Sequence, residues 1–397
     1  MSKSTKSLKR SKLISLEAIG FILRPLHTSL ISLIVVRLFT PDLWGMFVPF
    51  LIIVEVINTI INWGQKPYLM REFSLSPSKI SVLWAKAICS RGFLMLIAFL
   101  ILGMFSQFRA HFAFLVIWIA AKTMSVMFDS LIQFHRKYKQ SIFAESASIV
   151  VSLLLIFIYK DHIDLDFLIL MSAIAALVKG LILLPMIPRF EIQLFKTISI
   201  KKELQLSLPF FALAIAGLLQ SKLDLYTVAF FLEKGDIAFY QVTIGFLIVG
   251  QTFSMIVLGP FQKNIFRWQG NKIRNLKKTY LIIGVIITSV FSIGLYIILN
   301  WFYKFNLDLF YILIFFVYLI PLYFYLIESQ ILIRYNGEKK MLLYTSISAM
   351  ANLVLSVILV PVIGIVGALL AGAVCRLILA SLVVYQSKIV LELNVKR

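Results

Sequence analysis

Charged residues are scarce in this chain, and so are cysteine and histidine. Of its 397 residues, 60% are hydrophobic and 14% are charged, whereas a soluble domain usually carries about 25% charged residues. The apolar residues come in runs of roughly 18 to 25 along the whole chain, the length that crosses the hydrocarbon core of a bilayer as a helix. The short alternating runs of an outer-membrane barrel are not seen. We therefore expect an all-α polytopic membrane protein.

The rare residues also exclude several classes of site. Both cysteines, Cys89 and Cys375, lie inside apolar runs, which excludes a disulfide framework. The four histidines are scattered, and no His/Cys group has the spacing of a metal site. The chain has no phosphate-binding G-x-x-x-x-G-K-S/T loop and no G-x-G-x-x-G after a strand. We expect no cofactor, no ATP hydrolysis and no enzymatic activity.

About twelve membrane spans account for the apolar runs, and the basic residues orient them. With the N-terminus inside, the cytoplasmic segments hold 27 Lys and Arg, the opposite loops hold 5, and 7 lie within spans. Because Lys and Arg accumulate in cytoplasmic loops, both termini are predicted to be cytoplasmic. The net charge of +21 is then a topology signal and not a nucleic-acid surface. The predicted spans are 13–36, 46–63, 81–105, 112–134, 141–159, 167–187, 207–232, 236–258, 279–302, 308–334, 341–360 and 364–386.

A weak internal repeat divides the chain. Thr40–Phe47 follows the first span, and the similar segment Glu233–Tyr240 follows the seventh, 193 residues later. The basic turns that end the fourth and tenth spans recur at a similar distance. Two six-helix lobes in parallel orientation, 1–195 and 196–397, are predicted. Many transporters are built from such repeats, with the substrate path between them. Chance coincidence of short loop motifs is the alternative.

Basic residues near the middle of the spans are the first candidate functional groups. Each costs about 2.5–3.5 kcal/mol at a helix centre, so each is expected to face a water-filled cavity or an acidic partner. Their excess over acids predicts a cavity that attracts anions, and Arg offers a fork suited to phosphate oxygens. The alternative is that some of these basic residues form structural ion pairs with acids, as Lys122 would with Asp129. The candidates for binding a diphosphate are Arg24, Arg91, Lys122, Lys179, Lys222 and Arg376.

Polar and acidic residues within the spans form a second group of candidates. The second span carries a polar stripe at helical spacing, and the tenth carries tyrosines on one side. They line a cavity in our interpretation, and hydrogen-bonded helix contacts are the alternative. The candidates for contacting sugars are Asn58, Asn62, Tyr318 and Tyr325, and those for ion coupling are Glu55, Asp129 and Asp224.

Five short segments occur in an order and spacing typical of one transporter family. They are Arg37–Gly45, Ser207–Phe210, Gly235–Tyr240, Asn336–Lys340 and Val360–Ala368. In these segments the chain resembles the polysaccharide flippases of the multidrug/oligosaccharidyl-lipid/polysaccharide exporter superfamily. The resemblance implies two six-helix bundles around a V-shaped cavity. It also implies translocation of sugar units on a polyprenyl diphosphate, whose phosphates would meet Arg24, Lys222 and their neighbours.

The resemblance leads to a specific expectation of function. It is a flippase for undecaprenyl-diphosphate-linked oligosaccharide in the bacterial inner (cytoplasmic) membrane, serving O-antigen, capsule or exopolysaccharide assembly. The expected partners are that lipid-linked oligosaccharide and membrane lipids, with a polysaccharide polymerase and a chain-length regulator as candidate protein partners and no nucleic acid. Two alternatives remain. An ion-coupled multidrug or cation antiporter of the same superfamily is disfavoured by the basic mid-membrane residues, and a non-transporting scaffold leaves those residues unexplained.

The topology is testable by labelling single cysteines introduced into the loops. Cysteines near Lys201 and Lys272 should react with a membrane-impermeant reagent only from the cytoplasmic side, because their loops carry the excess of basic residues. Cysteines near Asp42, Asp164 and Asp308 should react only from the opposite side. Reaction near Lys272 from outside would contradict the twelve-span topology.

Overall fold

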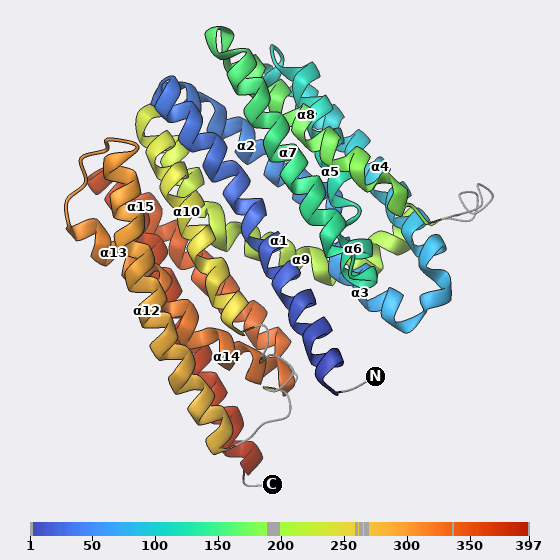
Figure 1. Cartoon of the computed structure of the whole chain (residues 1–397), viewed down its shortest axis with the longest axis vertical. Coiled ribbons are helices and arrows are strands. Elements are labelled where there is room, and N and C mark those ends of the chain that lie inside the picture. Colours follow the sequence, from blue (N-terminus) through green and yellow to red (C-terminus); the bar gives the residue numbers. More distant parts are fainter. Residues whose placement is uncertain are drawn as a thin grey trace. The chain divides into compact units, whose positions relative to one another are not determined.

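The computed structural model describes residues 3–188, 199–258, 261, 265, 270–335 and 337–395. The elements in these ranges are all helices (Figure 1). Asn336, which begins the segment Asn336–Lys340, lies outside them, and so do residues 189–198 between the predicted spans 167–187 and 207–232. The α-helices are α1 (Lys3–Leu38), α2 (Pro41–Asn62), α3 (Gln65–Leu75), α4 (Ile80–Met104), α5 (Phe112–Val126), α6 (Asp129–His135), α7 (Tyr138–Ile158), α8 (Leu165–Leu183), α9 (Ile200–Phe231), α10 (Lys234–Leu258), α12 (Asn271–Trp301), α13 (Phe310–Leu319), α14 (Pro321–Arg334) and α15 (Glu338–Val395).

The predicted spans agree with the helices. In the described part of the chain, 11 helical stretches are long and apolar enough to cross a membrane. Ten of them match predicted spans one to one. The last, Lys339–Leu391, has 53 residues, about twice the length that one crossing needs. Its backbone is non-helical at Ile363 and Gly364, so it joins the two spans predicted at 341–360 and 364–386. The chain is a multi-pass helical membrane protein.

Exposed apolar side chains on these helices suit a lipid environment. Leu96, Leu100 and Met104 of α4 are 62%, 74% and 79% exposed, and their spacing of four residues places them on one helix face. A helix satisfies its backbone hydrogen bonds internally. Such a face therefore needs only apolar side chains to lie against lipid tails.

The chain folds into two compact units. The first comprises residues 1–24 and 46–215, and the second comprises 25–45 and 216–397. Helices α1, α2 and α9 each contribute to both units. The sequence predicts a division between residues 195 and 196. In the structure, the end of α1 and the start of α2 belong to the second unit, and the first half of α9 belongs to the first unit.

Two interruptions of the helical spans shape the first unit. Trp63 and Gly64 adopt left-handed conformations, with φ of 45° and 63°, and separate α2 from α3. A Cβ on Gly64 would lie 2.3 Å from the carbonyl carbon of Phe210 in α9, so the close approach of α9 requires glycine there. Between α5 and α6, Trp84 donates a hydrogen bond from Nε1 to the carbonyl oxygen of Met127 at 3.4 Å. A side chain bonded into the helix ladder is a common cause of such a break.

Packing holds the short helices beside these interruptions. Helix α3 packs on α6 and α4, while α8 packs on α5 and α7 (Figure 1). Buried aromatic side chains fill the space between α3, α4 and α6, among them Tyr68, Trp84 and Phe128. The first residues of α3 and α6 thereby lie on the same packed core.

The second unit contains a close contact between the two repeated segments. Trp44, 1% exposed, donates from Nε1 to Oε1 of Gln241 at 2.8 Å. Next to it, a Cβ on Gly45 would lie 1.9 Å from the carbonyl oxygen of Lys234. Only a residue without a side chain allows this approach, which explains the glycine in the segment Thr40–Phe47.

Replacing Gly45 should therefore destabilise the protein. We expect Gly45→Ala to cost about 1–3 kcal/mol in the free energy of unfolding, because the added methyl group meets backbone that must shift. Gly294→Ala is the matched control, since a Cβ there meets nothing within 4 Å. Thermal unfolding of the purified variants in detergent measures the difference. Equal unfolding temperatures for the two variants would contradict the contact.

Candidate functional site

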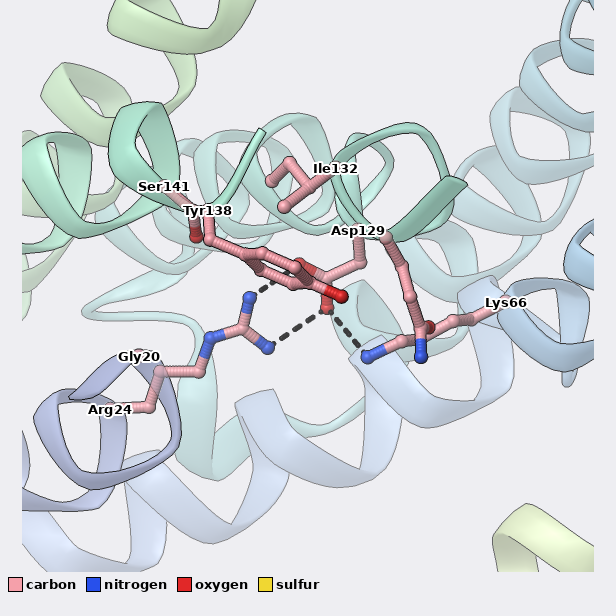
Figure 2. Close-up of a pocket in the computed structure, with 8 residues that line it drawn as sticks. Gly20, Arg24, Lys66, Asp129, Ile132, Tyr138 and Ser141 are labelled. Carbon is pink, nitrogen blue, oxygen red and sulfur yellow. Dashed lines mark hydrogen bonds and ion pairs between the residues drawn. The ribbon is translucent and has the colours of Figure 1, made fainter. Parts of the chain in front are cut away.

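The carboxylate of Asp129 is the centre of a charged cluster in the first unit (Figure 2). Arg24 of α1 donates from Nη2 to Oδ1 at 2.7 Å and from Nη1 to Oδ2 at 3.1 Å. Lys66 of α3 donates from Nζ to Oδ2 at 3.4 Å. The Arg24 pairing is the two-bonded fork that gives the strongest and most directional ion pairs.

These three side chains differ in their access to solvent. The side chain of Asp129 is 9% exposed, while those of Arg24 and Lys66 are 36% and 43% exposed. The carboxylate is thus buried beneath its two cations. A molecule approaching from the open side meets positive charge first.

The open side is a small pocket of ≈ 60 Å³. A site needs about 10–15 Å³ for each water molecule, so the pocket has room for roughly four or five waters, or for a phosphoryl group. The ring of Tyr138 lies beside the ion pair in Figure 2. The lining residues are Gly20, Arg24, Lys66, Asp129, Ile132, Gln133, Tyr138 and Ser141.

Two members of the cluster, Lys66 and Asp129, are placed by breaks in the helical spans. Lys66 is the second residue of α3 and follows the left-handed turn at Trp63 and Gly64. Asp129 is the first residue of α6 and follows the break after α5. Three different helices therefore converge on one carboxylate, and two of them begin at the cluster.

Further charges surround this centre. Lys179 of α8 pairs with Glu145 of α7 at 2.6 Å. Glu145 interacts electrostatically with Arg24, and Lys179 with Asp129. Arg91 of α4, 3% exposed, also interacts with Asp129. The cations Arg24, Lys66, Arg91 and Lys179 and the anions Asp129 and Glu145 leave a net charge of +2.

The second unit arranges its charges differently. The Arg376 guanidinium lies over the ring of Tyr318, with Cζ 3.6 Å from the ring centroid. It interacts with the carboxylate of Asp224, which is 1% exposed. Gly372 leaves room for this group, because a Cβ there would lie 2.7 Å from the Tyr318 ring. Arg376 is thus balanced by an acid and covered by an aromatic ring, the arrangement of a strut.

The remaining candidates lie outside the pocket. Lys122 and Lys222 are half-buried, as are Glu55, Asn62 and Tyr325, and Asn58 is buried. Asn62 donates from Nδ2 to the carbonyl oxygen of Asn58 at 2.8 Å, so this pair bonds within its own helix. The tenth span breaks at Ile320, which separates Tyr318 in α13 from Tyr325 in α14.

Sequence reasoning missed Lys66, because it assigned residues 64–80 to a cytoplasmic loop. The signal was Trp63-Gly64, where a glycine after an aromatic residue marks a turn and not the end of the helical segment. It also missed the partner of Lys86, which bonds Glu203 of α9 at 3.2 Å, and the pair of Lys277 with Glu328 at 2.6 Å. In the described ranges, no three His, Cys, Asp or Glu side chains come together to hold a metal ion.

The geometry can now be compared with known proteins. No protein-family model and no curated protein matches the sequence. Solved structures do match. Lipid II flippase MurJ in an inward closed conformation is 17% identical at a TM-score of 0.51, over 96% of this chain and 87% of that one. An inward-facing multidrug resistance MATE family transporter is 14% identical at a TM-score of 0.52, over 97% of this chain and 95% of that one.

A third match is a MOP superfamily transporter from Pyrococcus furiosus, reported with a binding pocket of reverse polarity. It is 13% identical at a TM-score of 0.55, over 96% of this chain and 95% of that one. This chain has the MOP transporter fold. At such identities the likeness concerns the fold alone, and the MOP fold serves flippases and multidrug transporters alike.

The strut assignment of Arg376 is testable through stability. Arg376→Lys keeps the charge but loses the planar group that covers Tyr318, so we expect a loss of about 1–2 kcal/mol in the free energy of unfolding. Arg274→Lys, at an exposed position of α12, is the matched control and should change little. Thermal unfolding in detergent measures both. An unchanged unfolding temperature for Arg376→Lys would argue against the role of Arg376 as a stacked strut.

Proposed function

We propose that this protein is a flippase for an anionic lipid-linked saccharide, an undecaprenyl-diphosphate-linked oligosaccharide, in the bacterial inner membrane. One observation supports the proposal most directly. Arg24 and Lys66 are reachable from the pocket, while the carboxylate that pairs with them is buried. The first unit therefore presents positive charge to a molecule in the pocket.

The charge of the pocket suits a diphosphate. A lipid diphosphate carries about two negative charges. The pocket is lined by two cations and one anion, and with Arg91, Lys179 and Glu145 around it the cluster has a net charge of +2. Coulomb attraction is stronger where water is scarce, so these cations offset part of the cost of bringing the headgroup into the membrane. Serving O-antigen, capsule or exopolysaccharide assembly is the corresponding proposed role.

The alternative is an ion-coupled multidrug antiporter, because the MATE transporters share the fold. A cationic drug needs an acidic group that it can reach. At the pocket, Asp129 is bonded to Arg24 and Lys66, and the neighbouring Glu145 is 5% exposed and paired with Lys179. These observations favour an anionic cargo over a cationic one.

Replacing the basic residues tests the cargo. We expect Arg24→Ala and Lys66→Ala each to reduce transport about tenfold or more, because both side chains line the pocket and a lost hydrogen bond to a charged group costs about 1.5–3 kcal/mol. Arg24→Lys should retain part of the activity, since the charge survives but the fork does not. The measurement is translocation of a fluorescent polyprenyl-diphosphate saccharide in proteoliposomes, together with restoration of surface polysaccharide in a flippase-null strain.

Arg109→Ala is the control, because Arg109 is exposed in the loop after α4. Blotting of membrane fractions confirms that every variant inserts. Normal transport by the double alanine variant of Arg24 and Lys66 would overturn the proposal. Export of cationic dyes that depends on Asp129, without movement of the lipid, would favour the antiporter.

A further inference from the structure

Arg91 is a buried cation whose hydrogen bonds are incomplete. It lies in the middle of α4 and is 3% exposed. Its Nε and Nη1 atoms are buried, and no hydrogen-bond acceptor reaches them from the residues that the structure describes. Guanidinium stays charged in proteins and carries five N–H donors, and a buried charge without a close partner costs several kcal/mol. A group of this kind needs a partner in at least one state of the protein.

Asp129 is an acid with which Arg91 interacts electrostatically. The helices that carry Lys66 and Arg91 are joined at this point, because Gln65, directly before Lys66, donates from Nε2 to the hydroxyl of Ser90, directly before Arg91. In this structure the carboxylate of Asp129 is bonded to Arg24 and Lys66 instead. Asp129 therefore bonds two cations, Arg24 and Lys66, and has a third cation, Arg91, that it does not bond. Whatever removes Arg24 and Lys66 from Asp129 leaves the carboxylate free for Arg91.

An anion in the pocket would have that effect. Arg24 and Lys66 line the pocket and Arg91 does not, so an entering anion meets the two cations that hold Asp129. Asp129 lies at the first residue of the seven-residue helix α6, directly after a break in the span. A turn of its side chain, or a small shift of this short helix, changes its partner without disturbing α5.

We propose that Asp129 exchanges partners during transport: an anion in the pocket takes over Arg24 and Lys66, and the released carboxylate pairs with Arg91. The identity of that anion as a lipid diphosphate rests on the proposed function, whereas the exchange rests on the ion pairs of Asp129 with Arg24 and Lys66 and on the unpartnered buried donors of Arg91. Arg91 is then a positioning residue that acts through Asp129. Part of the binding energy of the anion is used to break the Asp129 pairs, so the anion is held moderately and its release is assisted.

A double-mutant cycle tests the exchange, with inorganic pyrophosphate as the probe and the full chain in nanodiscs. Arg91→Met should weaken pyrophosphate binding about tenfold, because the displaced carboxylate finds no partner. Asp129→Asn should strengthen binding about tenfold, because Arg24 and Lys66 are no longer held by a charge. In the Asp129→Asn background, Arg91→Met should change the affinity less than about twofold, since the pair that it serves no longer exists. Titration calorimetry measures all four affinities.

The other outcomes overturn the exchange in different ways. An equal loss from Arg91→Met in both backgrounds makes Arg91 a direct ligand, and no loss in either makes it merely structural. Absence of pyrophosphate binding by the unmodified protein overturns the proposed function as well. If pyrophosphate binds but the effects of Arg91→Met and Asp129→Asn on its affinity simply add, only the exchange is overturned. Arg109→Met is the matched control and should bind normally. If Arg91→Met does not yield folded protein, Arg91→Gln, which removes the charge but keeps a donor, repeats the cycle with the same expected result.

Discussion

The buried carboxylate of Asp129 is the interaction on which the charged interior of the first unit depends. Without it, Arg24 and Lys66 would be two like charges facing each other in a poorly hydrated site, and both would be driven apart. The breaks at Trp63-Gly64 and after α5 serve this arrangement. They bring the first turns of α3 and α6 together and set both on a core of aromatic side chains. Local backbone irregularity is thus the means by which a helical membrane protein concentrates charge at one place.

The two units apply this principle to different ends. Asp129 and Glu328 lie 199 residues apart, each in a span that is broken into two helices, and each bonds a cation from another helix of its own unit. The surroundings then diverge. In the first unit the cations stay reachable from a pocket. In the second, Arg376 is covered by Tyr318 and balanced by Asp224. An internal repeat can therefore keep the positions of its charges while the surroundings of those charges differ between the two copies.

The sequence predicts the membrane spans well and the ion pairs between them poorly, for one physical reason. The length of an apolar run decides whether a helix crosses the bilayer, and run length is written in the sequence. Which charges meet depends on how each helix is rotated about its axis, about 100° per residue, and that is decided by packing partners far away in the chain. Arg24 and Asp129 could thus be recognised as buried charges, but not as partners. Lys66 was missed because the sequence predicts that the second span ends at residue 63. In the structure, a left-handed turn at Trp63 and Gly64 leads directly into the helix α3, which carries Lys66.

The fold alone does not select a cargo, because a lipid flippase and a multidrug transporter, 17% and 14% identical to this chain, share it. In the function proposed for this chain, the charges make that choice. A transporter must bind its cargo strongly enough to draw it from solvent or lipid, yet weakly enough to release it. Free cations at the pocket would favour binding and hinder release. Cations that are already paired with a buried acid lose that partner when the cargo arrives and regain it when the cargo leaves, so part of the attraction is offset. An acid beneath basic residues is therefore no contradiction in a site proposed for an anion. In the proposed exchange, it lowers the affinity for the anion and so favours release.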